Sequence, residues 1–275
     1  MSEVSADKQL KRKQLTVVLV TLLVIAAVAA LLFYVLLNSL LDRDARNERI
    51  DLQNGYRYMT AQSSQGMKLH ALITKPQNIE PVAINANVAE GTFTGINGGF
   101  FYGQDLLSIS IKDGKAINGE TGAYGSGSEN VKYSRGTLVW DGATALLSVQ
   151  KAGPWTELAV TDASNFWAQG GISMTLNDDS AWREAAILEK APFPDDFRLR
   201  SGVVYDQNGS LYLVVSETKG TLEQFRSAIK EQIGGGKLVD GIFLDGDGSS
   251  QLLAGETALR GDNRPVVQML RIVHD

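Results

Sequence analysis

Cysteine is absent from the 275-residue sequence, and histidine occurs only twice, as His70 and His274. Without cysteine the chain can form no disulfide, no thiolate nucleophile and no cysteine-ligated zinc site. Two histidines are too few for a histidine metal cluster, and no G-x-S-x-G nucleophile motif accompanies them. Carboxylate, amide, hydroxyl and guanidinium groups are therefore left to carry any chemistry.

Positive charge is in the minority: 26 lysines and arginines face 31 aspartates and glutamates, which gives a formal net charge of −5. Binding to nucleic acid requires a basic face that neutralises phosphates, so the composition predicts no nucleic-acid partner. The phosphate loop GxxxxGK[ST] is also missing, because Leu238 follows the Gly236-Lys237 pair.

One long apolar run, LTVVLVTLLVIAAVAALLFYVLL at residues 15–37, carries no charge. As a helix it is long enough for a hydrocarbon layer of about 30 Å. The basic triplet at 11–13 precedes it, so the positive-inside rule predicts a cytoplasmic N-terminus and a C-terminal domain outside, on the periplasmic or cell wall side of the cell membrane. A cleaved signal peptide is the alternative, but its apolar core normally runs only about 7–15 residues.

These features divide the chain into a cytoplasmic basic tail at 1–14, a transmembrane anchor at 15–37, a juxtamembrane linker at 38–60 and one domain at 61–275. The last part, roughly 215 residues, is long enough for a single domain with a proper core.

Short strands and tight turns dominate the domain. Asp113-Gly114, Asp141-Gly142 and Asn208-Gly209 each separate two apolar stretches, and such pairs adopt the positive φ values of two-residue hairpins. The predicted fold class is α+β, with a mixed, mainly antiparallel β-sheet. A strand–helix–strand unit near the C-terminus is expected to interrupt the hairpins.

That unit contains strands at 211–215 and 239–244 and a helix that begins with a capping box at Thr221. A helical crossover predicts that the two strands are parallel and end at the same edge of the sheet. Glu217 and Asp245 follow these ends, where ligands bind in parallel units.

Asp245 opens the sequence LDGDGSSQL at 244–252. An EF-hand would need Gly at the sixth position of its loop, where Ser250 stands, and a helix before the loop, where a strand is expected. A different divalent cation site at Asp245 and Asp247 stays open, although no cofactor is required. A carboxylate near a sugar can also support glycosidic bond cleavage, and an arginine can stabilise a phosphate leaving group.

Four motifs in order, 95-GINGGFF, 169-QGG, 200-RSGV and 244-LDGDGSS, resemble the phosphodiester glycosidase family, especially its bacterial branch, over residues 65–275. The resemblance implies removal of a sugar, typically N-acetylglucosamine, from a phosphodiester. The family loop has glycine where this chain has Asp247, so an additional charge enters the site.

Residue by residue, the family motifs match Asn97, Arg200 and Asp245, which are predicted to be catalytic, and Glu217 is added from the strand argument. In the resulting hypothesis Arg200 and the amides of residues 246–250 hold the phosphate, while Asp245 stabilises the anomeric centre or activates water. The predicted substrate-binding residues surround them in the motifs: Gly98, Gly99, Gln169, Gly170, Gly246, Gly248, Ser249 and Ser250.

The resulting prediction is a membrane-anchored hydrolase acting on a sugar phosphodiester in an envelope glycan or related glycoconjugate. Its expected partners are that glycan substrate and the membrane. The alternative is a non-catalytic glycan-binding or envelope scaffold module on the same fold.

Overall fold

The computed structural model describes residues 19, 22–23, 25–34 and 55–273. The chain divides into two compact units, Met1–Leu52 and Gln53–Asp275. No helix within the described residues is both long and apolar enough to cross a membrane. The predicted tail at 1–14, much of the predicted span at 15–37 and linker residues 38–54 lie outside the described residues.

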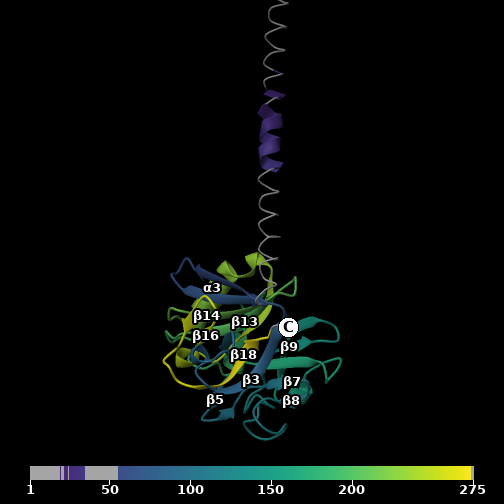
Figure 1. Ribbon diagram of the computed structural model, residues 1–275, viewed down its shortest axis with the longest axis vertical. Helices are drawn as coiled ribbons and strands as arrows, with labels where there is room; N and C mark the ends of the chain where they lie inside the picture. Colours follow the sequence, from purple (N-terminus) through teal and green to yellow (C-terminus); the bar gives the residue numbers. More distant parts are fainter. Residues whose placement is uncertain (1–18, 20–21, 24, 35–54, 274–275) are drawn as a thin grey trace, which may run out of the picture. The chain divides into compact units, whose positions relative to one another are not determined.

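Antiparallel pairing joins all named strands of the second unit into three sheets and a two-stranded ribbon (Figure 1). The first sheet has the order β1 (Arg57–Gln62), β2 (Lys68–Thr74), β14 (Leu211–Ser216), β13 (Ser201–Asp206), β15 (Leu238–Phe243) and β12 (Ile172–Ser173). The second contains β10 (Leu146–Ala152), β9 (Arg135–Asp141), β11 (Phe166–Gly170), β7 (Ser110–Lys112) and β8 (Lys115–Ala116). The third contains β17 (Ala258–Leu259), β16 (Leu252–Leu253), β4 (Gly95–Asn97), β18 (Val266–Ile272) and β3 (Ile79–Ala86), and the ribbon pairs β5 (Phe101–Tyr102) with β6 (Asp105–Leu106).

Helical segments connect these strands. The α-helices of this unit are α2 (Ala181–Leu188) and α3 (Leu222–Gln232). Single 3₁₀ turns are η1 (Pro76–Asn78), η2 (Val88–Glu90), η3 (Trp155–Glu157), η4 (Gly234–Gly236) and η5 (Asp247–Ser249). The predicted α+β class with mainly antiparallel pairing is confirmed, but the predicted mixed sheet is not, because every pairing between the described strands is antiparallel.

All three predicted hairpins form, but they turn in different ways. Asp113 and Gly114, with φ values of 50° and 73°, make the two-residue turn between β7 and β8. The other two hairpins use longer loops, 142–145 and 207–210. In these loops the carboxylates of Asp141 and Asp206, the last residues of the preceding strands, accept hydrogen bonds from loop amides. These bonds stabilise the turns without two successive positive φ values.

The predicted strand–helix–strand unit consists of β14, α3 and β15, and the capping box at Thr221 is present. β14 and β15 run in the same direction, as predicted, but β13 lies between them and pairs antiparallel with both. The unit is therefore a crossover over one intervening strand. Glu217 and Asp245 follow strands that end at the same edge but are not neighbours.

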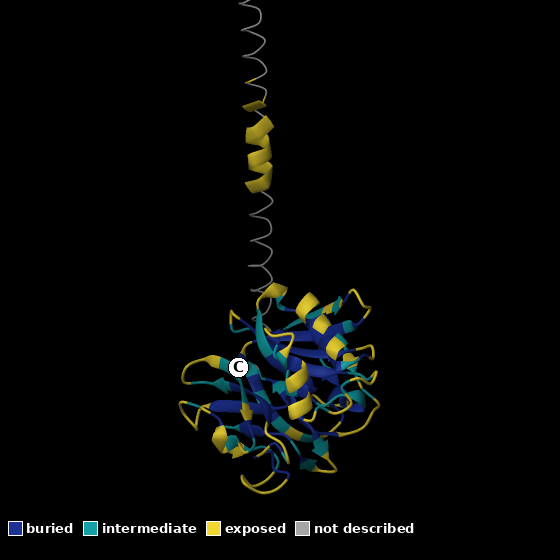
Figure 2. Ribbon diagram, turned by 180° about the vertical axis from the view of Figure 1, so that it is seen from behind, coloured by how far each residue is buried: buried dark blue, intermediate teal, exposed yellow. Residues whose placement is uncertain are grey.

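The central strands of the first sheet, β2, β14 and β13, are buried on both faces (Figure 2). On one face, alternate residues such as Val204 and Val214 pack with α2 and α3 around Phe225. On the other, Val203 and Leu213 pack against strands of the other two sheets. Strands covered on both faces form a rigid platform, and β15 ends in this platform at the loop that begins with Asp245.

β1 lies at one edge of this platform and begins before residue 61, within the stretch predicted to be linker.

Candidate active site

The loop 245–250 is fixed to the sheets by its backbone. The Asp245 amide donates to the Gly98 carbonyl at 3.2 Å, and the Asp247 amide donates to the Leu199 carbonyl at 2.7 Å. The amides of Gly246, Ser249 and Ser250 donate to Asp245 Oδ1, the Gly246 carbonyl and the Asp247 carbonyl, respectively. The amides of Gly246, Asp247, Ser249 and Ser250, which were predicted to hold a phosphate, are therefore already engaged in holding the loop.

Asn97 is fully buried at the end of β4, and its side chain also fixes the loop 245–250 to the sheets. Its Nδ2 donates to the Asp245 carbonyl at 2.9 Å. Its Oδ1 accepts from Ser201 Oγ at 2.8 Å and from the Gln251 amide at 3.1 Å. Because both ends of the amide are occupied, Asn97 positions Asp245 and has little remaining capacity to bind substrate or water.

The motif glycines allow close packing between segments. A Cβ at Gly98 would lie 1.9 Å from Gln268 Nε2, and one at Gly248 would lie 2.2 Å from Asp262 Oδ2. The predicted substrate-binding residues Gly99, Gly170 and Gly246 are equally confined by neighbouring atoms. A Cβ at any of these positions would require neighbouring atoms to shift.

Gln169 is also an interior residue of β11. Its Oε1 accepts from Gln268 Nε2 at 2.5 Å, and its Nε2 donates to the Gly170 carbonyl at 2.9 Å. Gln169 and Gly170 therefore connect the second and third sheets, and neither lines the cavity that contains Asp245.

Asp245 and Arg200 line one cavity of about 90 Å³, together with Gly246 and a mainly apolar wall. Phe100, Ile172, Pro192, Phe193, Leu222, Phe243 and Leu244 form that wall. Arg200 directly precedes β13, and Asp245 lies just after the end of β15. A guanidinium and a carboxylate thus meet at one edge of the first sheet. This is the pairing that the motifs predict.

Burial raises the pKa of Asp245 to about 6. The Ser249 hydroxyl, the Gly246 amide and the charge of Arg264 oppose this rise, and the charge of Asp247 adds to it. Ser249 Oγ lies near enough to influence the carboxylate but forms no hydrogen bond of regular geometry, and Ser250 Oγ is likewise buried without a partner among the described residues. The unpaired buried hydroxyl of Ser249, beside the Asp245 carboxylate, marks a place where a polar ligand or water fits.

Arg200 is buried, with 4% of the residue exposed. Nε donates to the Gly220 carbonyl at 3.0 Å, and Nη2 donates to the carbonyls of Phe193 and Asp196 at 2.8 and 2.6 Å. Burial and the nearby charge of Arg198 lower the pKa of Arg200 to about 10, so it stays protonated at neutral pH. Arg200 therefore holds the segment 193–196 as well as lining the cavity.

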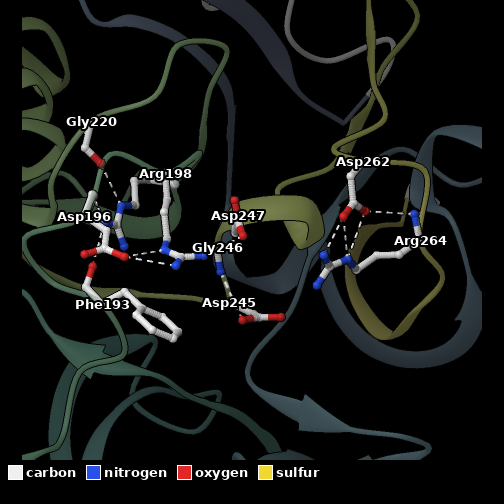
Figure 3. A network of polar contacts seen from close by, with 10 residues as sticks. Phe193, Asp196, Arg198, Gly220, Asp245, Gly246, Asp247, Asp262 and Arg264 are labelled. Atoms are coloured by element: carbon white, nitrogen blue, oxygen red, sulfur yellow. Dashed lines mark hydrogen bonds and ion pairs between the residues drawn. The ribbon is translucent and has the colours of Figure 1, made fainter.

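Two further arginines, which the motifs did not identify, flank Asp245 (Figure 3). Arg198 Nη1 donates to Asp247 Oδ2 at 2.6 Å. Arg264 pairs with Asp262, and this hydrogen bond, together with the charges of Asp245 and Asp247, raises the pKa of Arg264. Arg198 could have been found from its spacing. Residues two apart on an extended segment share a face, and Arg198 lies two residues before Arg200. Arg264 carries no local signal.

Asp247 has a φ of 55°, which explains why glycine suits this position in the family loop. Its carboxylate pairs with Arg198. Within the part of the chain that the structure describes, no group of three or more His, Asp or Glu side chains could hold a metal ion. A cation between Asp245 and Asp247 would therefore have to compete with Arg198.

Glu217 is the predicted catalytic residue that lies apart from the others. Its Oε2 contacts Lys68 Nζ at 2.6 Å and His70 Nε2 at 2.7 Å, both on β2. These hydrogen bonds lower the pKa of Glu217. Because β13 separates β14 from β15, the shared edge does not bring Glu217 to the cavity.

Antiparallel sheets that present a half-buried carboxylate and a buried arginine in one cavity define the class of this protein, an α+β domain with a carboxylate–arginine site. Its fold is similar to the auto-inhibited catalytic domain of zebrafish N-acetylglucosamine-1-phosphodiester alpha-N-acetylglucosaminidase, with a TM-score of 0.58 and 15% identity over 80% of this chain and 82% of that chain. A hypothetical protein from Synechocystis matches with a TM-score of 0.46 and 15% identity over 79% of this chain and 61% of that chain.

The phosphodiester glycosidase family model matches residues 90–274, and the chain belongs to that family. This range includes Asn97, Arg200 and Asp245, and the resemblance found in the motifs is confirmed. No curated protein matches the chain.

Proposed function

We propose that the protein is a membrane-anchored hydrolase that removes a sugar, N-acetylglucosamine or a close analogue, from a phosphodiester in an envelope glycan or related glycoconjugate. Family membership supports a glycosidase-type activity on phosphodiester bonds. The observation that carries the finer proposal is the cavity shared by Asp245 and Arg200. The apolar run at 15–37 and the basic triplet before it support a single-pass anchor with the catalytic domain outside.

In the proposed reaction, water breaks the bond between the anomeric carbon and the phosphodiester oxygen. The hydroxyl of water goes to the sugar, its proton goes to the phosphate product or solvent, and a phosphate monoester leaves. Asp245, ionised in most molecules at neutral pH, stabilises the positive charge on the anomeric carbon or accepts the proton of water. Arg200 stabilises the departing phosphate, with Arg198 and Arg264 at its flanks. This scheme requires no cofactor.

The test uses the full-length chain in detergent with UDP-N-acetylglucosamine and methyl N-acetylglucosamine-1-phosphodiester, with free sugar followed by NMR. Asp245→Asn is expected to abolish sugar release, because the amide can neither offset charge nor accept a proton. Glu217→Gln is the matched control at the same sheet edge, and it is expected to retain activity because Glu217 lies outside the cavity.

Binding of the substrates without turnover would instead indicate a glycan-binding module. Loss of activity in Glu217→Gln with retention in Asp245→Asn would contradict the proposed site. Repeating the assay with a chelator tests whether the reaction uses a divalent cation at Asp245 and Asp247, the site that the sequence left open.

A further inference from the structure

Exposed large hydrophobic side chains gather in the segment 187–197, which leads from the end of α2 toward the cavity. Ile187, Leu188, Phe193 and Phe197 are 68%, 55%, 58% and 65% exposed. Single exposed hydrophobic residues are ordinary on a soluble domain, but several in one segment indicate a binding surface. We call these four side chains the apolar segment.

The apolar segment is continuous with the candidate active site through Phe193, which also lines the cavity of Asp245 and Arg200. The Arg198 guanidinium lies 4.0 Å from the centre of the Phe193 ring and also donates to Asp247 in the loop. One arginine therefore lies between the charged part of the site and its apolar border.

The conformation of Phe193 is unfavourable in two respects. Its φ of 48° is sparsely populated by aromatic residues, and its ring remains exposed. Arg200 holds this conformation by donating to the carbonyls of Phe193 and Asp196, at the two ends of a turn that precedes Phe197. A strained backbone that keeps an aromatic ring in solvent beside the half-buried Asp245 carboxylate is typical of a ligand contact.

We propose that the apolar segment binds a hydrocarbon aglycone, the group on the other side of the phosphate from the sugar. This inference rests on the proposed function and names its substrate class: a sugar phosphodiester of a long-chain alcohol. The phosphate lies among Arg198, Arg200 and Arg264, the sugar faces Asp245, and the chain extends across Phe193 toward Leu188 and Phe197. Hydrolysis breaks the bond on the sugar side, so the alcohol leaves as its monophosphate.

A single apolar chain fits this segment better than the surface of a bilayer. Asp195 and Asp196 stand between the two phenylalanines, and both are exposed. An anionic bilayer would repel these carboxylates, and insertion of the segment would remove them from water. A chain lying along the apolar side chains leaves the carboxylates solvated.

The test measures binding of hexyl phosphate and methyl phosphate to the full chain in phosphatidylcholine nanodiscs, by NMR titration. We expect hexyl phosphate to bind about tenfold more tightly, which corresponds to partial burial of its additional methylene groups. Phe197→Ser with Leu188→Ser is expected to bring the ratio of the two affinities close to one. The matched control is Leu146→Ser, which removes a side chain that is 65% exposed at the start of β10 and is expected to leave the ratio near ten.

Equal affinities for the two phosphates in the unmodified protein would overturn the proposal. The proposal would also be overturned if the double variant lost binding to phosphatidylglycerol vesicles but kept its preference for hexyl phosphate. The apolar segment would then be a bilayer contact. Because alkyl phosphates contain no sugar, this result is independent of turnover. Failure to release sugar from the methyl diester would count against the proposed function and not against the apolar subsite.

Discussion

At the scale of single residues, the protonation state of Asp245 determines what the site can do. Burial places its pKa at about 6, and the neighbouring charge of Asp247 contributes to that rise. Asp247 occupies a glycine position of the family loop, so this chain has an additional charge that tunes the carboxylate. Arg198 pairs with Asp247 and moderates the effect.

The predicted pH dependence follows from the direction of this shift. If ionised Asp245 acts in the reaction, kcat/KM should fall about tenfold per pH unit below pH 6. Asp247→Asn removes a charge that raises the pKa of Asp245, so the fall in activity should begin at a lower pH. The measurement is the pH profile of sugar release for both proteins, with Glu217→Gln as the variant whose profile should not move. An acid limb that shifts upward in Asp247→Asn would contradict this assignment.

At the scale of elements, the family motifs describe how segments meet. Gly98 follows β4, and its amide donates to the Gln268 carbonyl of β18 at 3.1 Å. Gln268 continues the contact to Gln169 of β11. These motif residues therefore form a junction between the second and third sheets. They influence catalysis indirectly, because the junction sets the position of the loop that begins with Asp245.

Gly98→Ala is expected to destabilise the domain by about 1–3 kcal/mol, because a Cβ would overlap Gln268 and force a rearrangement in a packed junction. Gly91→Ala is the matched control, since its Cβ would meet the Val88 carbonyl oxygen at 3.4 Å, an ordinary contact distance, and its φ is −80°. Thermal unfolding of both variants measures the difference. An unchanged melting temperature for Gly98→Ala, accompanied by a raised KM alone, would indicate that this glycine contacts substrate.

At the scale of the whole molecule, the described strands of the domain belong to the unit Gln53–Asp275, and β1 closes one edge of its first sheet. The residue before β1, Tyr56, is buried, and its hydroxyl donates to Glu256 Oε2 at 3.0 Å and accepts from the Gly255 amide at 2.9 Å. The beginning of the domain is thereby joined to the loop between β16 and β17.

A fragment of residues 53–275 is expected to unfold cooperatively and to hydrolyse the methyl diester as the full chain does. A fragment of residues 63–275 lacks Tyr56 and β1, and it should melt about 5–10 °C lower because it loses a buried aromatic side chain and a strand. Calorimetry and sugar release on the two fragments provide the comparison. A folded but inactive 53–275 fragment would favour a scaffold that depends on the N-terminal segment.

The sequence by itself determined the features that neighbouring residues control. The hairpins, the capped helix α3 and the carboxylate that follows a buried strand were predictable, because turn propensity, capping and hydrophobic periodicity act over a few residues. The order of the family motifs also identified Arg200 and Asp245, which the structure brings into one cavity.

Only the tertiary structure decided which polar groups remain available for chemistry. From the motifs, Asn97 and Gln169 were predicted to act on or bind the substrate. In the structure their side-chain amides already form hydrogen bonds with residues that are distant in the sequence. Glu217 shares the sheet edge with Asp245 but pairs with β2, while Arg264 reaches the site from a turn with no motif. The physical reason is that buried hydrogen bonds and charges must be satisfied by whichever segments the sheets bring together, and those segments lie far apart in sequence.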